Sequence, residues 1–102
     1  MITRMWRGWA QVDRAHDYEQ HYRSEVMAAL RDVAGFQGAR LLRRTTGDET
    51  EFVSLTFFDD LDAVRAFAGP EYESAVVADR AREVLIRFDD HVAHYETALV
   101  IS

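Results

Sequence analysis

Residues 38–58 read GARLLRRTTGDETEFVSLTFF and predict a β-hairpin. The turn is expected at Gly47-Asp48, because glycine can adopt the positive φ angle that a two-residue hairpin turn requires. This turn places Arg44 opposite Glu51, and the opposite charges of these two side chains agree with the register.

The two faces of this hairpin differ in polarity. One face carries an apolar set that is expected to form the floor for helices: Leu42, Val53, Leu55 and Phe57. The other face carries a mixed set: Leu41, Arg43, Phe52, Ser54, Thr56 and Phe58. The mixed face is too apolar for free solvent, so it is expected to pack against a second copy of the chain. Both assignments depend on the register, because a slip of one residue exchanges the faces.

The segments before the hairpin predict one strand and one helix. Residues 2–10 are rich in aromatic and β-favouring side chains and are expected to form the first strand. Asp13 is a good N-cap for the helix, and Gly35 is expected to end it with a positive φ angle. The apolar stripe of this helix recurs at spacings of three and four residues: Tyr18, Tyr22, Val26, Ala29 and Val33.

The segments after the hairpin predict helices and a final strand. Asp59 and Asp60 offer N-caps for a helix that Gly69-Pro70 breaks. Three further elements are expected in chain order: a short helix that begins at Pro70, a helical stretch over residues 79–88, and a strand over residues 91–101.

The resulting order β-α-β-β-α-β is that of the ferredoxin-like α+β fold, with two helices on one face of a four-stranded antiparallel sheet. A chain of 102 residues is expected to form a single domain over residues 1–102. The mixed sheet face and the short helices around Tyr72 are expected to enclose a small, mainly apolar cavity with a few polar groups.

The composition excludes several classes of site. The chain has no Cys, which excludes disulfides and thiolate metal sites. A net charge of −6 opposes binding to a nucleic-acid backbone. His91 and His94 point to opposite faces of a strand, so no metal site is expected. No apolar run reaches the length of a membrane span and no signal-peptide pattern is visible, so a cytoplasmic location is expected.

Three segments resemble the antibiotic biosynthesis monooxygenase-like family of the dimeric α/β-barrel superfamily. Residues 34–38, AGFQG, look like the Pro-Gly-Phe-x-Gly corner of that family without its proline. Residues 59–67, DDLDAVRAF, look like its second helix, and His94-Tyr95-Glu96 lies in a matching last strand. The resemblance implies the ferredoxin-like fold and a homodimer, the dimeric α/β barrel.

The family includes cofactor-free oxygenases of phenolic polyketide-like substrates and haem-degrading oxygenases that use an Asn, a Trp and a His. This chain has no Asn, and Phe67 stands where a Trp is expected, which disfavours the haem-degrading branch. The resemblance therefore implies a cofactor-independent monooxygenase that acts on a phenolic or polyketide-like small molecule. Two alternatives remain open: a non-catalytic small-molecule-binding or stress-related dimer, and a cyclase or isomerase of the same superfamily.

His94 and Arg7 are the candidate catalytic residues. His94 could take a proton from a phenol or an activated carbon acid, because histidine titrates near neutral pH. A structural histidine within the sheet or at the dimer interface is the alternative. Arg7 could stabilise negative charge that develops on oxygen, or it could pair with one of the carboxylates.

The candidate substrate-binding residues lie on the expected cavity wall or above it: Trp6, Trp9, Arg43, Ser54, Thr56, Phe58 and Tyr72. Trp6 and Trp9 point to opposite faces of the first strand, so only one of them can line the cavity. Tyr72 could donate a hydrogen bond to a substrate carbonyl or pack on Val76. No phosphate-binding glycine loop or dinucleotide motif is present, and no cofactor is expected.

Overall fold

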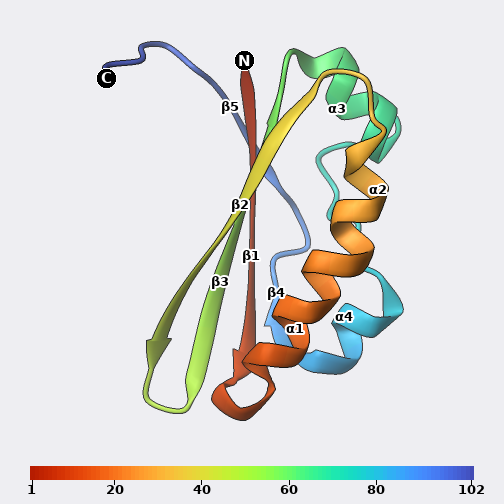
Figure 1. Cartoon of the computed structure of the whole chain (residues 1–102). Coiled ribbons are helices and arrows are strands. Elements are labelled where there is room, and N and C mark those ends of the chain that lie inside the picture. Colours follow the sequence, from red (N-terminus) through yellow and green to blue (C-terminus); the bar gives the residue numbers. More distant parts are fainter.

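The computed structural model describes residues 1–102 and shows an antiparallel sheet with helices along one face (Figure 1). The elements in chain order are β1 (Ile2–Gln11), the 3₁₀-helix η1 (Val12–Arg14), α1 (Ala15–His21), the π-helix η2 (Tyr22–Val26), α2 (Met27–Arg31), β2 (Phe36–Thr46), β3 (Glu49–Phe58), α3 (Leu61–Ala68), α4 (Asp79–Val84), β4 (Leu85–Phe88) and β5 (Ala93–Glu96). The strand order is β2-β3-β1-β4, and β5 also pairs with β1. This is the ferredoxin-like α+β arrangement that the sequence predicts.

The central hairpin confirms the predicted turn and register. Gly47 has a φ angle of 64° and, with Asp48, connects β2 to β3. Arg44 lies opposite Glu51, and its Nη2 atom is 2.6 Å from Oε1 of that carboxylate.

The predicted use of the two hairpin faces is wrong. Phe52 and Phe58 of the mixed face are 1% and 0% exposed, because they pack beneath the helices. The Phe52 ring centroid lies 4.9 Å from that of Tyr18 on α1. The hydroxyl groups of this face also find partners in the interior, since Tyr22 Oη lies 2.8 Å from Ser54 Oγ. The mixed face is therefore buried beneath the helices in spite of its polar residues.

The apolar set of the hairpin lies on the opposite face, which no helix covers (Figure 1). Val53, Leu55 and Phe57 are only partly buried there, and Leu42 is 47% exposed. Directly paired residues share a face, so β1 adds Met5, opposite Leu55, to this set. We call this uncovered side of the sheet the open face.

The N-terminal helical segment keeps the predicted apolar stripe but is interrupted. Tyr18 and Tyr22 are buried, and the π-helix η2 separates α1 from α2. Asp13 does not cap the helix: it lies within η1, and no side chain caps α1. Gly35 has the expected positive φ, 87°, and a Cβ atom there would lie 2.8 Å from Cβ of Ala63.

The C-terminal third departs most from expectation. Asp60 caps α3 as predicted, and its carboxylate accepts a hydrogen bond from the Ala63 amide at 2.9 Å. Pro70 begins a turn and not a helix. The helix predicted over 79–88 ends at Val84, because Leu85 is extended and pairs with Ala10 of β1.

The final strand is also shorter than predicted. It covers only Ala93–Glu96, and residues 97–102 form no regular structure. No helix in the structure has both the length and the apolar character needed to cross a membrane.

Candidate functional site

A cavity of about 250 Å³ lies between the helix layer and the covered face of the sheet. Most of its wall is apolar, from η2, α2, α3 and the segment between α3 and α4: Val26, Leu30, Phe67, Val76 and Val77. The polar groups of the wall come from β1, β3 and the first helical segment: Arg4, Tyr18, His21, Tyr22, Glu25, Ser54 and Thr56. An apolar pocket with a few converging polar groups is typical of a small-molecule site.

Three of the predicted substrate-binding residues line this cavity: Trp6, Ser54 and Thr56. Trp6 is therefore the tryptophan on the cavity side. Its ring position is fixed because Nε1 donates a hydrogen bond to the Asp89 carbonyl oxygen at 2.7 Å.

Three other predicted residues lie outside the cavity lining. Phe58 is fully buried in the core beside Phe67. Arg43 is exposed, and its Nη1 atom donates to the Glu19 carboxylate at 2.9 Å. Tyr72 stacks edge-on against the His94 ring, with ring centroids 5.3 Å apart.

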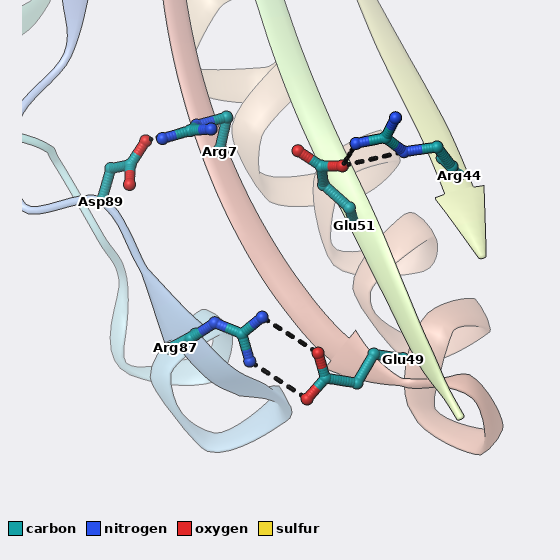
Figure 2. Close-up of polar contacts among 6 residues, drawn as sticks. All are labelled: Arg7, Arg44, Glu49, Glu51, Arg87 and Asp89. Atoms are coloured by element: carbon teal, nitrogen blue, oxygen red, sulfur yellow. Dashed lines mark hydrogen bonds and ion pairs between the residues drawn. The ribbon is translucent and has the colours of Figure 1, made fainter. Parts of the chain in front are cut away.

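Arg7 and Trp9 lie on the open face, away from the cavity. Figure 2 shows Arg7 directed toward Asp89, with Nε 2.9 Å from the carboxylate oxygen. The Trp9 ring has the guanidinium carbons of Arg7 and Arg87 within 5.3 and 4.7 Å of its centroid. Arg87 in turn makes two hydrogen bonds to Glu49, at 2.9 and 3.0 Å (Figure 2). The structure thus does not bring Arg7 together with His94.

The cation at the cavity is Arg4, which the sequence analysis missed. Its side chain comes from β1, is only 6% exposed and has no carboxylate within ion-pair distance. Nη1 donates to the carbonyl oxygen of Tyr72 and lies 3.0 Å from Nε2 of His94. Burial lowers the pKa of Arg4 to about 10, so the guanidinium stays charged at neutral pH. Buried charges in proteins are normally paired, which makes this site unusual.

His94 holds Arg4 from β5. A guanidinium only donates hydrogen bonds, so Nε2 of His94 must accept, and the ring proton is then assigned to Nδ1. Burial and the nearby charge of Arg4 lower the pKa of His94, whereas Glu73 opposes the shift. His94 is accordingly neutral at pH 7. The proton-accepting role suggested by the sequence requires the contact with Arg4 to break.

The helical wall carries two phenols and a histidine. Burial raises the pKa of Tyr18 and that of Tyr22, so both remain neutral hydrogen-bond donors under ordinary conditions. His21 lies between them on the same helix face and is 5% exposed. Its Nδ1 atom is 2.9 Å from Oε2 of Glu25.

Arg4 and His21 each had a visible signal in the sequence. Arg4 shares the strand alternation of Trp6 and Gly8, which places a cation on an otherwise apolar face. His21 stands three residues after Tyr18 and therefore belongs to the buried stripe. The structure contains no group of three His, Asp or Glu side chains that could hold a metal ion.

Comparisons with known proteins agree with this architecture. The sequence pattern of the antibiotic biosynthesis monooxygenase family matches residues 1–79. No curated protein matches the chain in sequence.

Three solved structures share the fold. The heme-degrader MhuD from Mycobacterium tuberculosis is 19% identical, covers 100% of both chains and has a TM-score of 0.67. The cofactor-independent oxygenase SnoaB from Streptomyces nogalater is 19% identical, with 98% of this chain and 95% of that chain covered and a TM-score of 0.70. A monooxygenase from the gene ActVA-Orf6 of Streptomyces coelicolor, in complex with nanaomycin D, is 15% identical, with 99% and 92% covered and a TM-score of 0.62. Identities this low show a common fold alone.

Proposed function

The chain belongs to the antibiotic biosynthesis monooxygenase family, and on that basis we propose that it is a cofactor-independent monooxygenase of a phenolic or polyketide-like small molecule. The substrate occupies the cavity between the helix layer and the sheet, against Trp6, Ser54 and Thr56. The observation that carries the proposal is the buried charge of Arg4, which has no carboxylate partner, in a mostly apolar wall. Such a charge stabilises a substrate anion, which is the species that reacts with oxygen without a cofactor.

The proposed reaction needs only the substrate and dioxygen. Loss of a proton gives a phenolate or enolate, whose negative oxygen is stabilised by Arg4. The anion transfers one electron to dioxygen, and the resulting radical pair combines to a peroxide. For a ring methylene, cleavage of the peroxide leaves one oxygen atom as a carbonyl, and the second departs as water with the two hydrogens. Arg4 thus takes the part that the sequence suggested for Arg7.

His94 has a positioning role in this proposal. Its Nε2 atom accepts from Arg4, while the carbonyl of Tyr72 accepts on the other side of the same nitrogen. The two contacts fix the guanidinium in the cavity wall. A neutral histidine can do this without repelling the cation.

Oxygen uptake tests the proposed function. Purified protein treated with a chelator is supplied with anthrones, quinols and simple phenols in an oxygen electrode. Substrate-dependent uptake with release of the oxygenated product is expected. A ligand that binds in the cavity and is recovered unchanged in air favours the binding-protein alternative, and turnover without oxygen favours a cyclase or isomerase.

We propose further that the open face forms a homodimer. Its centre is apolar and includes Met5, Val53, Leu55 and Phe57. Arginine–carboxylate pairs lie beside this centre, among them Arg44 with Glu51 and Arg87 with Glu49 (Figure 2). An apolar patch with a polar rim is typical of a protein interface. The second copy therefore covers the face opposite to the one that the sequence analysis expected.

Leu55→Arg is expected to separate this dimer into folded monomers. The new charge lies at the centre of the open face, so association would bury it without a partner. We expect at least a ~100-fold rise in the dimer dissociation constant, from the loss of a central hot spot. Sedimentation velocity measures it, with Ala66→Arg on the exposed side of α3 as the matched control. A Leu55→Arg protein that remains dimeric contradicts the proposed interface.

A further inference from the structure

One buried side-chain polar atom in this protein lacks a hydrogen-bond partner, and it is Nδ1 of His21. His21 is 5% exposed and lines the cavity. Unsatisfied buried polar atoms are rare in native proteins, and a catalytic role is one of their recognised causes. No protein group hydrogen-bonds to the other ring nitrogen, Nε2, either.

Glu25 lies one turn further along the helix, where its carboxylate can accept a hydrogen bond from the His21 ring. Its Oε2 atom is 2.9 Å from Nδ1, yet the two atoms do not form a hydrogen bond in this arrangement. The Glu25 side chain is 61% exposed, and no other residue holds it. A rotation of this free side chain brings the carboxylate into line with the ring N–H. A carboxylate at Nδ1 leaves the lone pair on Nε2 and stabilises the imidazolium that forms when Nε2 takes a proton.

The backbone that carries the pair is irregular at this point. The π-helix η2 begins at Tyr22, directly after His21, and includes Glu25. Single-turn π-helical segments are concentrated at functional sites, because they shift side chains that a regular helix would space differently. Tyr18 and His21 of α1 and Tyr22 and Glu25 of η2 all line the same cavity.

We propose that His21 and Glu25 are the proton-accepting pair of this cavity. This assignment rests on the proposed function. The hydroxyl proton of a phenolic or enolic substrate passes to Nε2 of His21, and its electron pair stays on the substrate oxygen. The imidazolium is balanced by Glu25 through Nδ1. The proton is returned when the peroxide is cleaved and water leaves. His21 is the catalytic residue of the pair, and Glu25 positions it.

The other titratable groups of the cavity do not compete for this role. They are Tyr18 and Tyr22 from the same helical segment and Arg4 from β1. Both phenols keep their protons, because burial raises the pKa of each. Arg4 has no lone pair to offer, and the segment facing His21 before α4 is apolar at Val76, Val77 and Ala78.

Kinetics of the variants test the pair directly. We expect His21→Gln to lower kcat for oxygen uptake about 10²-fold with little change in KM, as for loss of a general base. Added imidazole should restore part of the rate to His21→Ala. Glu25→Gln, an exposed change that leaves the fold intact, should lower kcat less than His21→Gln does, because it removes only the carboxylate that orients the ring. His16→Gln, an exposed histidine on the same helix, is the matched control. His21→Gln with kcat within 3-fold of the unmodified protein overturns the proposal.

A second measurement works without oxygen and separates this proposal from the proposed function. 4-Nitrophenol is added at neutral pH under nitrogen, and its visible phenolate absorbance reports the ionised fraction of the bound probe. The unmodified protein should raise that fraction more than His21→Gln, in which only Arg4 is left to stabilise the phenolate, even if no compound is ever oxygenated. Equal ionisation in both proteins, or no binding of the probe to either, overturns the assignment of His21.

Discussion

Replacing Arg4 with glutamine is expected to lower oxygen uptake about 10³-fold, the upper range for removal of one group that stabilises developing negative charge. Glutamine can still donate to the carbonyl of Tyr72, so the local structure should persist. The fold should not be weakened severely, because Arg4 is a buried cation without a carboxylate and carries a desolvation cost. Arg4→Lys should retain only part of the activity, because it restores a positive charge without the planar guanidinium that contacts Tyr72 and His94.

The pKa of His94 gives an independent test of whether the Arg4→Gln variant has lost the positive charge beside His94. The charge of Arg4 is one of the two causes that lower this pKa, after burial. In Arg4→Gln the pKa of His94 should therefore rise, which NMR titration of the ring protons measures. If the Arg4→Gln protein takes up oxygen at an unchanged rate, Arg4 does not stabilise the substrate anion, whatever happens to the pKa of His94.

Phe58→Ala is expected to destabilise the protein by about 3–5 kcal/mol, as for truncation of a fully buried aromatic ring. Phe58 is 0% exposed and contacts Phe36 and Phe67, with ring centroids 5.8 and 6.1 Å apart. A domain of this size is usually stable by only about 5–15 kcal/mol, so much of the fold's stability is at stake. Urea denaturation with constant m values measures the change.

Phe57→Ala is the matched control, because the same ring is removed from the neighbouring residue on the open face. Both variants should be compared in the Leu55→Arg background, so that dimer formation does not contribute to the measurement. The control should lose clearly less stability than Phe58→Ala, because Phe57 is only partly buried. A larger loss for Phe57→Ala than for Phe58→Ala contradicts the placement of the helices on the mixed face.

Local signals explain why much of the fold could be predicted from the sequence. The Gly47-Asp48 turn and the Arg44–Glu51 pair determine the hairpin register without any tertiary information. The side of the hairpin that receives the helices is not a local property. Both faces carry large apolar residues, and the choice depends on whether Ser54 and Thr56 find partners across the core, as Ser54 does with Tyr22.

The site was less predictable because it depends on pairs that are distant in the chain. Arg4 and His94 are 90 residues apart, and their contact exists only because β1 and β5 pair. Arg7 looked equally suited to hold an anion, but strand alternation directs it to the other face. The helix predicted at Pro70 failed for a related reason. That segment is fixed by non-local contacts such as Arg4 with the carbonyl of Tyr72, and not by local helix propensity.

The alternation of β1 has a consequence for how this protein can diverge in evolution. Arg4 and Trp6 face the cavity, whereas Met5, Arg7 and Trp9 face the other side. Substitutions at the first set can alter the cavity while the open face, the proposed dimer surface, is inherited unchanged, and the reverse also holds. An insertion or deletion of one residue in this strand would exchange both sets in a single event. Lineages of this protein are therefore free to vary the composition of β1 but strongly constrained in its length.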